Sequence, residues 1–96
     1  MEIGRVIGSV WATKKDENLR GQKLVVLKIL QDKYKEKDDI VVATDIIGAG
    51  VDDLVLVSRG TGARHATGNE NAPVDMAVIG IVDSIEINEN VNGGNV

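Results

Sequence analysis

The stretch that most constrains this fold lies at residues 45–64, which read DIIGAGVDDLVLVSRGTGAR. Two glycine-rich corners enclose a short apolar run, and the second corner ends in an arginine. Glycine and aspartate clusters mark turns, and so short an apolar run between turns is typical of a strand. The chain before this stretch has the pattern of strands leading into a corner. The chain after it has the pattern of one long strand leaving.

Segments rich in Val, Ile and Leu recur along the chain. In the second of them Val25, Leu27 and Ile29 point to one face, and the alternate residues, also largely apolar, point to the other. Glycines interrupt the first and last segments, which is typical of a bulge, a bend or a close approach of two backbones. The pattern predicts five strands, over residues 2–13, 23–31, 40–44, 54–58 and 77–87.

Two short helical turns are expected between the fourth and fifth strands. One covers residues 63–66, where Gly62 and Gly68 limit it at both ends. The other covers residues 73–76, because Pro73 is favourable at the first position of a helical turn.

The predicted fold class is mostly β, namely a small five-stranded OB-like β-barrel with one short helical insertion before the last strand. Residues 14–22 and 32–39 are highly charged and are expected to be exposed loops. Residues 1–88 are expected to form a single OB-like barrel domain, and residues 89–96 a disordered C-terminal tail. The helical insertion follows the fourth strand, whereas a typical OB fold has its helix between the third and fourth.

Composition argues against several classes of function. The net charge is −4, and Trp11 and Tyr34 are the only aromatic residues, whereas nucleic-acid binders usually carry a basic field and stacking platforms. The chain has no cysteine, which excludes disulfides and thiol chemistry and suits the cytosol. No apolar segment has the length of a signal peptide or membrane span. A chain of 96 residues buries little surface alone, so oligomerisation is expected.

The first corner does not predict a cofactor or metal site. Gly48, Ala49 and Gly50 match the opening of a dinucleotide-binding motif, but Asp53 stands where a third small residue is required and a strand follows instead of a helix. Asp45 and Asp52 lack the spacing of a calcium loop, and we interpret them as surface acids beside a turn. The sequence predicts no metal and no cofactor.

Catalysis has equally weak support. Ser58, His65 and Asp75 can be written as a triad, but any chain of this length offers such a triple, and no nucleophile-elbow motif accompanies it. We expect no catalytic residues and no enzymatic activity. A small enzyme relying on His65 stays a third hypothesis.

Four sequence segments, taken together, resemble those of one protein family. IGRVIGSVWAT and LRGQKLVVLKI are followed by ATDIIGAGVDDLVLVSRGTGAR and then APVDMAVIGIVDSIEI, in order and at matching distances over nearly the whole chain. These segments are similar to the EutN/CcmL family, the pentamer-forming vertex proteins of bacterial microcompartment shells. Thr61 and Gly62 fill places where relatives usually have two small residues, and Asp52 stands where many have glycine.

The resemblance implies an architectural function without an active site. The chain would form a homopentamer that caps the vertices of a polyhedral, carboxysome-like shell in the bacterial cytoplasm. Its partners would be itself and hexameric shell proteins, with no nucleic acid and no membrane. The resemblance does not distinguish between shell types. The alternative reading is an OB-like binding module for an oligonucleotide or oligosaccharide.

Both corners are expected at or near subunit contacts. Arg64 can pair with one of the nearby acids, Asp45, Asp52, Asp53 or Asp75, either across a subunit boundary or within one chain. The interface candidates are Asp45, Gly48, Ala49, Gly50, Arg59, Gly60 and Arg64.

Overall fold

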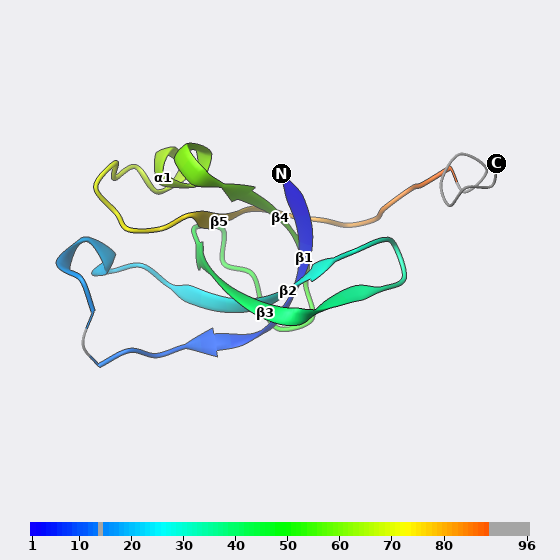
Figure 1. Ribbon diagram of the computed structural model, residues 1–96, viewed down its shortest axis with the longest axis horizontal. Helices are drawn as coiled ribbons and strands as arrows, with labels where there is room; N and C mark the ends of the chain where they lie inside the picture. The colour runs from blue at the N-terminus through cyan, green and yellow to red at the C-terminus, as the bar shows by residue number, and fades with distance from the viewer. Residues whose placement is uncertain (14, 89–96) are drawn as a thin grey trace.

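The computed structural model describes residues 1–13 and 15–88, and their strands close into a five-stranded barrel (Figure 1). The neighbour order around the barrel is β1-β2-β3-β5-β4, with β4 returning to β1. A short helix lies between β4 and β5, so the predicted fold class is confirmed. The elements are β1 (Glu2–Val10), the 3-10 turn η1 (Glu17–Leu19), β2 (Leu24–Leu30), β3 (Glu36–Asp45), β4 (Leu54–Arg59), α1 (Gly60–Thr67) and β5 (Met76–Ile81).

All strand pairs are antiparallel except the one between β3 and β5. That parallel pair has only two rungs, Thr44 beside Ala77 and Asp45 beside Val78. The upstream part of β3 therefore pairs with β2 alone. Closure of the barrel depends on this short seam.

The core fills the inside of the barrel with β-branched and other aliphatic side chains. Val25, Leu27 and Ile29 of β2 all point inward, as the alternation predicts, and they pack with Val6 and Val57 among others. Each fully buried side chain of this size contributes about 1.5–3 kcal/mol. The small residues Ala63 of α1 and Ala77 of β5 are completely buried, so the helix approaches the sheet closely.

Bulges bend the first and last strands. The register between β1 and β2 shifts between Val6 and Gly8, and the register between β4 and β5 jumps at Ile79. At Gly4 a Cβ would lie 3.2 Å from the carbonyl oxygen of Lys28, so two backbones meet closely there. These features confirm the interpretation of the strand glycines, since bulges supply the curvature that a small barrel needs.

Three strand boundaries differ from those predicted by three residues or more. β1 ends at Val10 and not at residue 13, because its ladder with β2 ends at the pair Val10 and Leu24. β3 begins at Glu36 and not at residue 40, because the charged residues predicted as a loop continue the hairpin with β2 up to the pair Leu30 and Glu36. β5 ends at Ile81 and not at residue 87, because its partner β4 begins at Leu54 and offers only one more hydrogen bond, to Val82.

The helical elements also differ. α1 begins at Gly60, before Gly62, although Gly68 ends it in a left-handed conformation as predicted. Residues 73–76 form no helical turn, because Val74 and Met76 are buried and Met76 already pairs with Arg59 in the sheet. The tail predicted at 89–96 lies outside the described residues.

Candidate subunit interface

The first corner is built around the carboxylate of Asp45. One oxygen accepts hydrogen bonds from the backbone N–H groups of Ile47 (2.9 Å) and Gly48 (3.0 Å), and the other accepts one from Ala49 (2.8 Å). The Lys23 ammonium lies 3.2 Å from the same carboxylate and donates to the carbonyl oxygen of Ala49 at 2.9 Å. Asp45 and Lys23 thus hold the loop from both sides.

Asp45 is not the surface acid that the sequence suggested, because its side chain is fully buried. Burial of the carboxylate opposes its charged form. The three backbone N–H groups and Lys23 outweigh that penalty, so the pKa of Asp45 lies below its usual value. A metal ion would have to displace these partners, since both oxygens already accept hydrogen bonds.

The loop held by Asp45 presents apolar side chains to solvent. Gly48 has φ of +93°, a conformation that L side chains rarely adopt, and this lets the chain turn back immediately after Ile47. Ile46 and Ile47 are each 45% exposed, and Val51 is 64% exposed. The signal in the sequence was an aspartate at a strand end followed by glycine three residues later, which favours an Asx-type turn.

Asp52 occupies a left-handed backbone position with φ of +74°, a conformation that favours glycine. Its carboxylate pairs with Arg5 at 2.9 Å, and Arg5 also binds Glu36 of β3 in a two-point contact. The hydrogen bond from Arg5 holds the pKa of Glu36 below its usual value. This partly exposed network joins β1, β3 and the loop.

We expect the backbone at position 52 to govern stability more than the ion pair there. Asp52→Gly should change the free energy of unfolding by less than about 1 kcal/mol. Glycine relieves the backbone strain at this left-handed position, and this gain offsets the loss of the exposed ion pair with Arg5. Asp52→Val should be destabilised by about 1–3 kcal/mol, because a β-branched residue disfavours that conformation. Urea unfolding of both variants measures the difference. Equal stability of the two would contradict this reading.

The second corner joins β4 to α1. Arg59, the last residue of β4, forms an ion pair with Glu2 of β1, which lowers the pKa of Glu2. Gly60 has φ of +62°, and its N–H donates to the carbonyl oxygen of Asp75. Arg64 lies on α1, and its guanidinium donates to the Thr61 hydroxyl at 3.3 Å.

Arg64 makes no ion pair with any acid that the structure describes. Asp45 forms its ion pair with Lys23, and Asp52 forms its ion pair with Arg5. Of the two arrangements expected for Arg64, the one within a single chain is therefore not formed here. A pair across a subunit boundary stays a hypothesis.

The two corners do not form one site. β3 runs parallel to β5 and β4 runs antiparallel to it, so the chain leaves these strands toward opposite ends of β5. Asp45, Gly48, Ala49 and Gly50 accordingly cluster in one loop. Arg59, Gly60 and Arg64 lie on the other side of β5.

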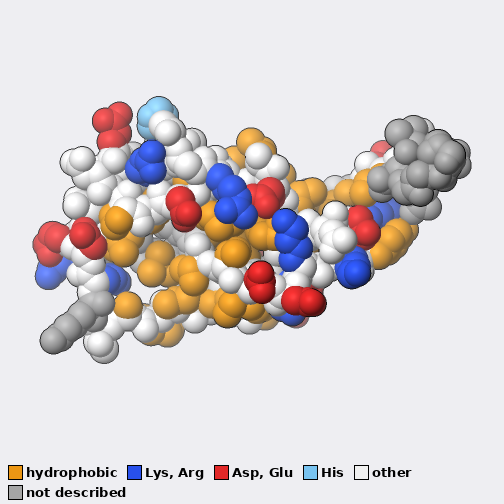
Figure 2. Space-filling view, viewed as in Figure 1, with side chains coloured by type: hydrophobic (Ala, Val, Ile, Leu, Met, Phe, Trp, Pro, Cys, Tyr) orange, Lys and Arg blue, Asp and Glu red, His pale blue; other side chains and the backbone are white. Residues whose placement is uncertain are grey.

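An apolar surface also covers the outside of β2 and β3. Val26 stands beside Val42, and Lys28 beside Ile40, all on the outer face. Ile40 and Val42 are 59% and 46% exposed. Figure 2 shows hydrophobic side chains gathered over the region where Figure 1 places these strands, with charged groups around them. Sequence reasoning anticipated it, because both faces of residues 23–31 are largely apolar.

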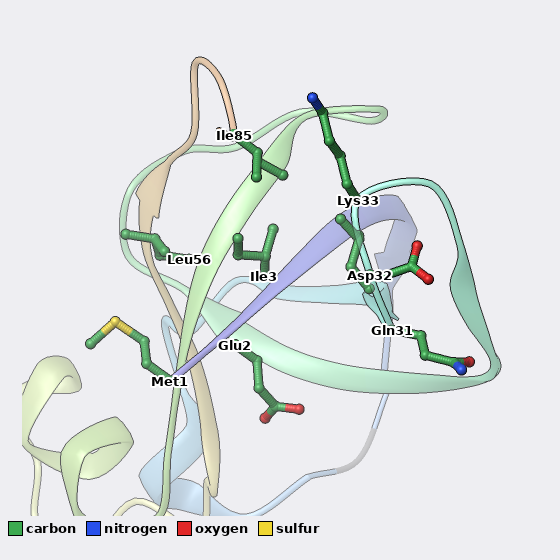
Figure 3. Close-up of a pocket in the computed structure, with 9 residues that line it drawn as sticks. Met1, Glu2, Ile3, Gln31, Asp32, Lys33, Leu56 and Ile85 are labelled. Atoms are coloured by element: carbon green, nitrogen blue, oxygen red, sulfur yellow. The ribbon is translucent and has the colours of Figure 1, made fainter. Parts of the chain in front are cut away.

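A groove of about 490 Å³ opens at the start of β1. Figure 3 shows Ile3, Leu56 and Ile85 close together on its wall, contributed by β1, β4 and the segment after β5. Asp32 and Lys33, from the turn between β2 and β3, form its rim. The lining is mainly aliphatic, with Glu2, Asp32 and Lys33 as its charged side chains, so the groove offers chiefly apolar contact area.

The structure does not bring together the residues of a catalytic triad or of a metal site. No hydrogen bond links the side chains of Ser58, His65 and Asp75 within the described part of the chain. Within residues 1–13 and 15–88, no group of three His, Asp or Glu side chains is arranged to hold a metal ion. None of the helices in residues 1–13 and 15–88 is long and apolar enough to cross a membrane.

Several known proteins that share this sequence pattern and fold are named as shell proteins of microcompartments. The carboxysome shell vertex protein CcmL of Nostoc sp. is 43% identical over 90 residues, covering 93% of this chain and 89% of its own length. The structure of Gloeobacter violaceus CcmL superposes with a TM-score of 0.85 at 40% identity, covering 91% of this chain and 90% of that one. The pentameric microcompartment shell protein GrpN of Rhodospirillum rubrum gives a TM-score of 0.82 at 40% identity, covering 91% and 99%.

The sequence profile described as "Ethanolamine utilisation protein EutN/carboxysome" matches residues 1–83. That match includes all five strands, α1 and both glycine-rich corners. This chain is a member of the EutN/CcmL family.

Proposed function

We propose that this protein assembles into a ring of five copies that caps a vertex of a bacterial microcompartment shell. The observation that carries the proposal is the likeness to GrpN, a pentameric shell protein that matches this chain over nearly its whole length. Relatives named as vertex proteins of carboxysomes and other microcompartments support the same function.

The surface of the barrel suits such a ring. A ring with rotational symmetry uses two different patches on each subunit, one for each neighbour. This chain leaves several apolar regions uncovered in different places, namely the loop around Ile47, the face around Val42 and the groove around Leu56. Burying two of them in every copy would compensate for the small core of a short chain.

The proposed partners are further copies of this chain and the hexameric shell proteins that tile flat facets. A layer of hexagons closes into a polyhedron only if pentagonal units occupy its corners, so the function requires shape and no catalytic residue. The shell would lie in the cytoplasm. The seven interface candidates named from the sequence belong to this proposal, with Arg64 as the one to test first.

Native mass spectrometry tests the ring directly. We expect the main species to have five times the mass of the 10.2 kDa chain. Arg64→Ala should shift the distribution toward smaller species if Arg64 binds an acid of the neighbouring copy, whereas Arg20→Ala, a control in an exposed loop, should not. Single-stranded DNA added to the same sample should leave the mass unchanged. A chain that stays monomeric at micromolar concentration would contradict the proposal, and a DNA complex would favour the binding-module alternative.

A further inference from the structure

Residues 83–87, which follow β5, have the sequence of a strand but no strand partner among the residues that the structure describes. Val82 donates its N–H to the carbonyl oxygen of Leu54 at 2.8 Å, which is the last rung of the barrel. Residues 83–87 make no backbone hydrogen bond with any other residue that the structure describes. Figure 1 shows this segment, drawn in orange, leaving the barrel.

Its side chains alternate as those of a half-buried strand do. Ile85 and Ile87 are partly buried, whereas Glu86 between them is exposed. This period of two made the segment appear to be part of the last strand in the sequence. An extended chain with this pattern and unpaired N–H and C=O groups is a natural donor for strand addition.

The same molecule offers an open edge that could accept such a strand. β3 pairs with β2 from Glu36 onward, but it meets β5 only at Thr44 and Asp45. The other edge of residues 36–43 has no strand partner within the described residues. Ile40 and Val42 stand exposed on this stretch. An uncovered apolar edge strand invites pairing with another chain.

We infer that residues 83–87 of one copy add as a strand to the free edge of β3 in a neighbouring copy. Ile85 and Ile87, two residues apart, would lie beside Ile40 and Val42, which have the same spacing and face outward. Cross-strand pairs of β-branched residues stabilise sheets. The new main-chain hydrogen bonds would give the contact a defined register.

The partner is a second copy of this chain because each copy provides one donor segment and one acceptor edge. A contact that joins two different patches passes from copy to copy and closes when the rotation allows it. The inference therefore rests on the proposed ring and specifies one contact within it. It also makes residues 83–87 part of the assembly.

Engineered disulfides test the contact, since the natural chain contains no cysteine. Ile85→Cys is combined in turn with Asp38→Cys, Ile40→Cys and Val42→Cys, so that neighbouring registers are sampled. Two cysteines bridge only when their Cα atoms lie within about 7 Å. After mild oxidation we expect at least one pair to give covalent dimers and longer ladders on a non-reducing gel. The control, Ile85→Cys with Trp11→Cys, should give only monomers.

Native mass spectra of the same samples separate the outcomes. Rings without covalent dimers from any of the three pairs would overturn this inference and leave the proposed function standing. Monomers without cross-links would overturn both. A disulfide formed within one chain would show that the segment folds back on its own β3, which also overturns the inference. Ile87→Cys, on the same face of the segment as Ile85, replaces Ile85→Cys if the latter variant does not fold.

Discussion

Replacing Asp45 with alanine is expected to lower the free energy of unfolding by about 3–5 kcal/mol, a large part of the stability of a small domain. The variant leaves the N–H groups of Ile47, Gly48 and Ala49 without their acceptor and Lys23 without its counter-charge. Each unsatisfied buried donor costs about 1–3 kcal/mol, although part of the loop would become hydrated.

Urea unfolding at one fixed protein concentration measures this effect, because association adds to apparent stability. Asp39→Ala is the matched control, since Asp39 lies on the same strand with its side chain exposed. It should change the free energy of unfolding by less than about 0.5 kcal/mol. Similar losses in both variants would mean that the carboxylate of Asp45 has no special role.

Asp45→Asn separates the charge from the hydrogen bonds. The pKa of Asp45 is lowered in the folded state, so its ionised form adds stability above the unfolded pKa of about 3.9. That contribution disappears as the pH falls through the lower pKa of the folded protein. We therefore expect the stability difference between parent and Asp45→Asn to shrink below about pH 4. A difference independent of pH would exclude a role for the charge.

Replacing Leu27 with alanine should cost about 2–5 kcal/mol, because the side chain is completely buried inside the barrel. The strands form a closed barrel around this side chain, so they have limited freedom to collapse into the cavity that the substitution leaves. Leu24→Ala, on the same strand at a half-buried outward position, should cost less than half as much. Thermal and urea unfolding measure both variants. A small loss for Leu27→Ala would show that the core repacks.

The barrel could be predicted from the sequence because each strand has its own local signal. The alternation of Val25, Leu27 and Ile29 and the glycines that mark the bends are properties of neighbouring residues. The start of β3 was missed for the opposite reason. Lys37 and Asp38 have low strand propensity and lie at an irregularity of the ladder, and it is the pair of Glu36 with Leu30 beyond them that extends the strand.

The candidate site was only partly predictable. The glycines of both corners were identified, but nothing local indicated that Lys23, 22 residues earlier in the chain than Asp45, would meet its carboxylate. The assumption that an aspartate beside a turn is exposed failed because the N–H groups of a loop can replace water around a carboxylate. If an acid of a neighbouring copy binds Arg64, as proposed, the sequence of one chain contains no local signal for that contact.

The two-rung seam between β3 and β5 sets the order in which the barrel can form. β1, β2 and β3 follow one another and can pair as a meander as soon as they have been synthesised. β5 is the last strand made, and it lies between β3 and β4. The ring of strands therefore cannot close on a ribosome until Ile81 has left the exit tunnel. Until then the inner faces of the meander stay open to water.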